Sequence, residues 1–144
     1  MAAMEPDTFL RQGASVLAEK LEPLGYEFAI IQPPLKGSGG PFAWAAFRRG
    51  DREMRLWARY DRLGSVHYRL GDDEFTHQDY MRAMGLEKSA HWPAFEDGDP
   101  LGDFRGLLRD LTNCDEFLTG DATSVVERVR ALPPEKAGFK ALGS

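Results

Sequence analysis

The amino-acid sequence predicts one α+β domain built around an antiparallel four-strand meander, with an N-terminal helix and about three C-terminal helices packed on one face. Four segments between about Phe28 and Leu70 alternate apolar and polar residues and are joined by short connections, and helical patterns precede and follow them. Consecutive strands with segregated helices are typical of α+β proteins. The length of 144 residues suits a single core, so we expect one domain over residues 1–144, with about 134–144 a loose tail.

Apolar residues recur at helical spacing in the first part of the chain. The stripe consists of Leu10, Ala14, Leu17, Leu21 and Leu24. This spacing places them on one face of a helix, with Asp7 as the expected N-cap and residues 23–25 as the stop signal. Gly13 lies inside this helix and weakens it by up to about 1 kcal/mol relative to alanine.

The periodicity changes after Gly25 from helical to alternating. Tyr26, Phe28 and Ile30 alternate with more polar or smaller neighbours and predict a first strand. The segment from Gln32 to Pro41 is dominated by proline and glycine, so we expect a loop without regular structure. Three more strands are predicted, over Phe42–Arg49, Glu53–Tyr60 and Ser65–Leu70. Connections this short can join only antiparallel neighbours.

Alternation along the last two of these strands predicts which face each side chain occupies. Apolar Met54, Leu56, Ala58, Tyr60, Val66, Tyr68 and Leu70 alternate with Arg55, Trp57, Arg59, Ser65, His67 and Arg69. One face is therefore expected to carry the core and receive the helices, while the other stays open.

The last third of the chain reads as helical. Thr76 is the expected N-cap of a short helix that ends near Gly85, and a longer helix is predicted from about Leu101 or Gly102 to Leu111. Asp121 is the expected N-cap of a final helix. Residues 89–98, between the first two of these helices, are expected to be irregular.

No pattern in the chain points to a catalytic, metal or cofactor site. His67, His77 and His91 lack metal-ligand spacing, and Cys114 is followed by two acids that disfavour a thiolate. The glycine-rich segment at 36–40 leads into a strand rather than a helix, so it does not match a phosphate loop. We therefore expect no metal, no cofactor and no catalytic residue. Whether the histidines and acids converge in space stays open, and a small enzyme with an acid/base carboxylate pair remains an alternative.

Charge is distributed unevenly along the chain. Between Arg48 and Arg69 there are seven arginines and three acids, a net charge of +4, whereas between Asp72 and Asp121 thirteen acids and four bases give −9. Tryptophan and arginine are the residue types enriched at binding hot spots. The predicted binding residues on the open face are Arg55, Trp57, Arg59, His67 and Arg69. In the alternative interpretation, the arginines pair with the protein's own acids and their stems cover Trp57.

These features favour a non-enzymatic protein–protein interaction domain, such as an immunity or antitoxin-like protein or an adaptor. An alternative is an anionic ligand or single-stranded nucleic acid at the Arg/Trp face, where Trp57 would stack on a base. The net charge of −5 disfavours nucleic acid. No signal-peptide pattern, no membrane-length apolar run and a single cysteine predict a cytoplasmic protein without a membrane partner.

The run GGPFAWAAFRRGDREMRLWARYDRLGSVHYRLGD, from Gly39 to Asp72, and the THQDYMRAMG that follows shortly after it resemble small uncharacterised bacterial proteins. The resemblance covers about half of the chain. It implies a bacterial origin and a regular fold, and it carries no activity and no functional residue.

Overall fold

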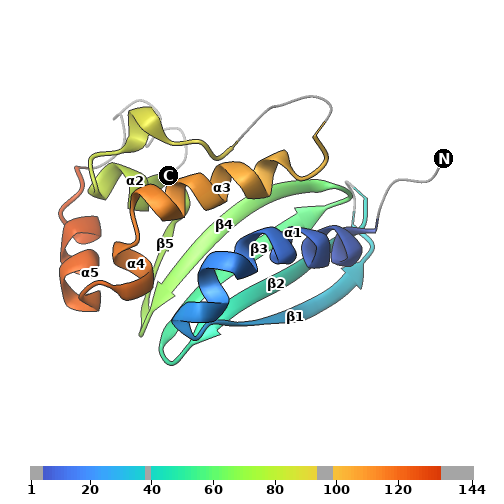
Figure 1. Ribbon diagram of the computed structural model, residues 1–144, viewed down its shortest axis with the longest axis horizontal. Coiled ribbons are helices and arrows are strands. Elements are labelled where there is room, and N and C mark those ends of the chain that lie inside the picture. The colour runs from blue at the N-terminus through green and yellow to red at the C-terminus, as the bar shows by residue number, and fades with distance from the viewer. Residues whose placement is uncertain (1–4, 38–39, 94–98, 134–144) are drawn as a thin grey trace.

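The structure, a computed structural model, describes residues 5–37, 40–93 and 99–133. The strands are β1 (Glu27–Leu35), β2 (Phe42–Arg49), β3 (Arg52–Arg59), β4 (Arg62–Leu70) and β5 (Asp73–Thr76). The helices are α1 (Pro6–Leu21), η1 (Glu22–Leu24), α2 (His77–Ala83), η2 (Glu87–Ser89), α3 (Gly102–Asn113), α4 (Glu116–Thr119) and α5 (Ala122–Arg130). The fold is α+β, as predicted (Figure 1).

The strands form one antiparallel sheet in the order β1-β2-β3-β4-β5. The predicted four-strand meander is therefore confirmed in its connectivity but lacks one strand. The missing strand is β5, which has four residues and pairs with the end of β4, Tyr68 opposite Phe75. Four residues are too few for alternation to stand out from the neighbouring turn and helix cap.

The predicted loop from Gln32 to Pro41 is wrong at its start, because β1 continues through Pro33 and Pro34 to Leu35. β1 is an edge strand, where a proline does not have to donate to a second neighbour. Its pairing with β2 also shifts register twice, once on each side of Gln32. The expected tip of the loop, at residues 38–39, lies outside the described residues.

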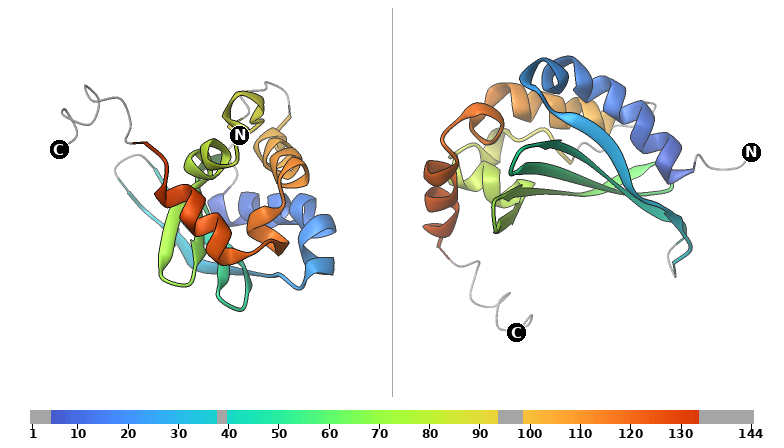
Figure 2. Two further views of the ribbon diagram at one scale, coloured as in Figure 1. Left: turned by 90° about the vertical axis from the view of Figure 1, so that its left-hand side faces the viewer. Right: turned by 90° about the horizontal axis from the view of Figure 1, so that it is seen from below.

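The two longest helices, α1 and α3, lie on one face of the sheet. α1 and α3 run across this face, as Figure 1 shows, and an edge-on view shows them on the same side (Figure 2, right). The core between the layers contains Phe9, Leu10, Leu17 and Leu21 of α1, Phe104, Leu107 and Leu111 of α3, and Met54, Leu56, Val66 and Tyr68 of the sheet. This confirms the predicted apolar face.

The helix boundaries follow the expected capping residues at two of three places. The side chains of Thr76 and Asp121 accept from backbone N–H groups in the first turns of α2 and α5, as predicted. α1 begins earlier than expected, with Glu5 at the N-cap and Asp7 inside the first turn. Pro6 explains the difference, since proline is favoured at the first helical position. The short helix α4 was not predicted, and the expected tail lies outside the described residues.

Gly13 allows α1 to approach α3 closely. A Cβ atom at this position would lie 2.2 Å from the ring of Phe104, which is fully buried. We expect Gly13→Ala to lower the free energy of unfolding, because overpacking costs about 1–3 kcal/mol and exceeds the ~1 kcal/mol gain in helix propensity. Chemical denaturation measures this change. The control is Ser15→Ala on the exposed side of α1, which we expect to be neutral or slightly stabilising. A Gly13→Ala variant more stable than wild type would contradict the close packing.

Candidate functional site

The side of the sheet turned away from α1 and α3 is here called the open face. Among the described residues no helix lies over it (Figure 2, right). The strand register turns all five predicted binding residues toward this side: Arg55, Trp57 and Arg59 from β3, and His67 and Arg69 from β4. Their neighbours Met54, Leu56, Val66 and Tyr68 are buried in the core. The predicted separation of faces is therefore correct except at Tyr60, which was expected in the core but lies beyond the end of β3 and is exposed.

Four rings form a continuous track across the open face. Trp44 lies opposite Trp57 on the neighbouring strand, with ring centroids 6.3 Å apart. The ring of Phe42 follows at 5.9 Å from Trp57, and that of His67 at 6.0 Å from Trp44. We call these four residues the aromatic track. Sequence reasoning missed Phe42 and Trp44, although the two-residue turn after Arg49 fixes the register that pairs Trp44 with Trp57.

Gly64 gives the Trp57 indole its place on the sheet. The pairing of β3 with β4 shifts register between Trp57 and Ala58, which makes Gly64 the extra residue of a bulge. A Cβ atom on Gly64 would lie 2.5 Å from the indole ring of Trp57. The ring of Trp57 therefore packs directly on the backbone of β4, and its position depends on position 64 being a glycine, which has no side chain.

Three arginines of the open face converge on one acid. Arg48 and Arg55 each donate from Nε to the carboxylate of Glu53, and Arg69 lies 3.9 Å from it. Burial acts to raise the pKa of Glu53, but the hydrogen bonds from Arg55 and Arg48 outweigh it and hold the pKa below its ordinary value. Arg69 also lies 4.0 Å from Glu74. Each of these three arginines therefore has an acidic partner within the protein, and the five charges sum to +1.

Three further arginines serve the helical layer. Arg49 donates to the carbonyl of Leu24, 3.0 Å away, and Arg52 donates to the carbonyl of Phe117 at 2.8 Å. Arg62 lies 3.8 Å from the buried carboxylate of Asp103. The interpretation that the arginines pair with the protein's own acids is therefore correct for four of the seven between Arg48 and Arg69, whereas Arg49 and Arg52 bond backbone carbonyls instead.

Arg59 is the exception. Its guanidinium carbon lies 5.1 Å from the ring centroid of Trp57 and 5.9 Å from that of Phe42. Within the described part of the chain no acid lies in ion-pair range of Arg59, and its buried Nε has no hydrogen-bond partner. A cation held over aromatic rings is attracted by their π-faces. Its charge is otherwise not neutralised.

The open face is shallow. A hollow of about 180 Å³ lies between Trp44, Arg55, His67, Arg69 and Glu74. Small-molecule sites usually enclose ~300–1,000 Å³ and surround most of the ligand. The open face therefore suits contact with an extended surface better than enclosure of a small molecule.

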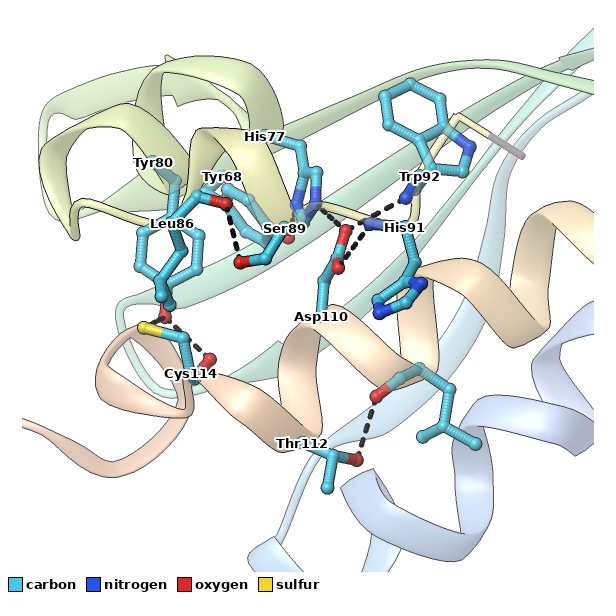
Figure 3. A network of polar contacts seen from close by, with 11 residues as sticks. Tyr68, His77, Tyr80, Leu86, Ser89, His91, Trp92, Asp110, Thr112 and Cys114 are labelled. Carbon is cyan, nitrogen blue, oxygen red and sulfur yellow. Dashed lines mark hydrogen bonds and ion pairs between the residues drawn. The ribbon is translucent and has the colours of Figure 1, made fainter. Parts of the chain in front are cut away.

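A second polar cluster is buried on the helical side of the sheet (Figure 3). The ring of His77 contacts the Tyr68 hydroxyl through Nδ1 at 2.6 Å and Asp110 through Nε2 at 2.8 Å. Asp110 also accepts from the backbone N–H groups of His91 at 2.6 Å and Trp92 at 3.0 Å. The cluster therefore joins β4, α2, α3 and the segment before residue 93.

The protonation of this cluster follows from its partners. Burial acts to raise the pKa of Asp110, but the hydrogen bonds from His77, His91 and Trp92 together keep the pKa below its ordinary value. Nε2 of His77 donates to the carboxylate of Asp110, and Nδ1 shares a hydrogen bond with the Tyr68 hydroxyl. Burial raises the pKa of Tyr68 well above its ordinary value, so this phenol keeps its proton.

This cluster is closed off from solvent. Tyr68, His77 and Asp110 are at most 1% exposed, and both ring nitrogens of His77 have protein partners. A hollow of about 310 Å³ beside α2 is lined in part by His77 and Trp92. Within the described residues, the partners of both ring nitrogens of His77 are themselves buried in the core.

The three histidines do not meet in one site. His67 lies on the open face and His77 in the core, while His91 reaches Asp110 through its backbone only. Among residues 5–37, 40–93 and 99–133, no group of three metal-ligating side chains could hold a metal ion. Cys114 is buried, with its sulfur 3.3 Å from the Tyr80 hydroxyl.

We expect Asp110→Asn to lower the free energy of unfolding at neutral pH by about 3–5 kcal/mol, because it removes a buried charge on which three donors converge. A folded-state pKa below the unfolded value means that ionised Asp110 stabilises the protein above the unfolded pKa of ~3.9. That contribution is lost as pH falls through the folded-state pKa. The variant should therefore be less stable at pH 7 and show a shallower loss of stability below pH ~4.

Denaturant titrations across this pH range measure both effects. The control is Asp115→Asn, which changes an exposed acid close to the end of α3 and should change neither quantity appreciably. If Asp110→Asn and wild type had the same free energy of unfolding and the same dependence on acid pH, the cluster would not stabilise the fold as we expect.

Comparisons with protein-family models, curated proteins and solved structures found no match for this chain. The resemblance of residues 39–72 to small bacterial proteins therefore stays a prediction. No helix in the part of the chain that the structure describes is long and apolar enough to cross a membrane.

Proposed function

We propose that this chain is a non-enzymatic protein-binding domain that docks a partner protein on its open face. The observation that supports the proposal best is the aromatic track with Arg59 stacked on it. Half-buried tryptophans beside an arginine are the residue types that contribute most to binding at protein interfaces. An immunity or antitoxin-like role, or that of an adaptor, in the bacterial cytoplasm is the kind of function that such a small acidic domain would serve.

The shape of the open face favours a macromolecule. The hollow of about 180 Å³ is smaller than an ordinary ligand pocket, whereas the aromatic track extends over three neighbouring strands. A flat array of rings gains most when a second surface covers it and removes it from water. A partner protein can supply such a surface.

Electrostatics favour a protein over a nucleic acid. Phosphate binding depends on several cations that are free to replace counterions. On the open face Arg48, Arg55 and Arg69 already contact Glu53, and Arg69 also lies near Glu74, so two acids offset part of the charge of these three cations. The net charge of −5 adds a general repulsion toward a polyanion. Stacking of a base on Trp57 remains the alternative that the experiment below distinguishes.

We expect Trp57→Ala, and separately Trp44→Ala, to weaken binding of the partner by at least ~2 kcal/mol, a rise of roughly 30-fold in Kd. Partners are captured from an extract of the source cells on immobilised wild-type protein, identified, and then titrated as purified proteins. Gly64→Ala is a third variant, which displaces the Trp57 ring without removing it and should also weaken binding.

The matched control is Arg109→Ala, an exposed substitution on α3 on the other side of the sheet, which should leave Kd unchanged. Thermal unfolding verifies that every variant is folded. Equal affinity of wild type and both tryptophan variants for the same partners would exclude the open face as the interface. Binding of single-stranded RNA or DNA that needs Trp57 and falls steeply between ~50 and 200 mM salt would favour the alternative.

A further inference from the structure

We propose that Arg59 is the specificity-determining residue of the open face, and that it binds a carboxylate of the partner next to an apolar side chain that covers the aromatic track. The inference rests on the proposed function and adds the chemistry of the partner. It predicts an acidic residue beside an aromatic or aliphatic one in the segment of the partner that meets Trp44 and Trp57.

The first support is the contrast between Arg59 and the other arginines of β2, β3 and β4. Six of them contact a carboxylate or a backbone carbonyl of their own protein. In the described residues Arg59 lies over the rings of Trp57 and Phe42 and has no carboxylate in ion-pair range. A carboxylate of a partner could therefore pair with Arg59 without breaking an existing ion pair among the described residues.

The second support is preorganisation. Stacking over the rings of Trp57 and Phe42, at 5.1 and 5.9 Å from their centroids, restricts the guanidinium of Arg59. A guanidinium group whose position is already restricted loses less conformational entropy when it binds a carboxylate. Cation–π contact uses none of the hydrogen bonds by which arginine binds a carboxylate, commonly two in parallel.

The third support is the charge of the surroundings. Arg59 lies opposite Arg62 on β4, and Arg62 contacts the buried carboxylate of Asp103. Along the strands, the other end of the open face carries Arg48, Arg55 and Arg69, which already have Glu53 and Glu74 as partners. Among the described arginines of β2, β3 and β4, Arg59 alone has no carboxylate or carbonyl partner, and one such cation matches a single carboxylate better than a row of phosphates.

A random linear peptide library displayed on phage tests the chemistry of this surface directly. Peptides are selected on immobilised wild-type protein and then synthesised, each with a copy in which its acidic residues are replaced by their amides. We expect the enriched sequences to share an aspartate or glutamate beside an aromatic or aliphatic residue. Affinities for wild type and variants are measured by isothermal titration calorimetry.

The key variant is Arg59→Gln, which we expect to weaken binding of the acidic peptide at least ~10-fold, as for a hydrogen bond between charged groups. The amide copy should bind wild type as weakly as the acidic peptide binds Arg59→Gln. Arg59→Gln should not weaken binding of the amide copy any further, because the two changes remove the same contact. Arg48→Gln is the matched control: it removes the same charge from the same face at a residue that is paired with Glu53, and should change Kd less than ~2-fold.

The outcomes separate this inference from the proposed function. If Trp57→Ala abolishes peptide binding while Arg59→Gln does not, the open face binds but Arg59 does not select acids, and this inference is overturned. If neither variant affects binding, both proposals fail. Enriched peptides without acids, no enriched peptides at all, or displacement of the acidic peptide by single-stranded DNA through Arg59 would also overturn the inference.

Discussion

The antiparallel register of β2, β3 and β4 is the constraint on which both faces of this protein depend. The two-residue turn after Arg49 places Trp44 opposite Trp57, and the same pairing places Ala45 opposite Leu56 in the core. Because side chains alternate along a strand, a slip by one residue would exchange the two faces. Alanines at 43, 45, 46 and 58 are fully buried and leave room for the helices on one side and for large side chains on the other. The aromatic track is therefore a consequence of the pairing that forms the core.

The buried carboxylate of Asp110 provides the second constraint. It holds α2, α3 and the segment at residues 91–92 together on the helical side, through His77 and two backbone N–H groups. An unpaired charge at this depth would cost several kcal/mol, so the cluster is stable only when all its members are in place. This arrangement holds His77 in the core, and no helix of the described residues lies over the opposite side of the sheet (Figure 2, right).

The sequence was sufficient to predict features that depend on local periodicity. Alternation in β3 and β4 correctly placed Arg55, Trp57 and His67 on one side, because the period of two is a property of the strand itself. The contacts of Glu53 and Asp110 could not be predicted, since each joins residues from different elements, as far apart as His77 and Asp110. β5 and α4 are too short to show a period, with four residues each. The extension of β1 through its prolines is possible only at a sheet edge, a position that sequence alone does not reveal.

The central claim is that the open face, rather than the helical layer, meets the partner. The most direct measurement is photocross-linking in the source cells, with benzoylphenylalanine in place of Arg55 on the open face or of Arg109 on the exposed side of α3. Glu53 keeps Arg48 and Arg69 as partners when Arg55 is replaced. The account predicts a cross-linked protein partner at residue 55 and none at residue 109. A partner cross-linked only at residue 109 would contradict it.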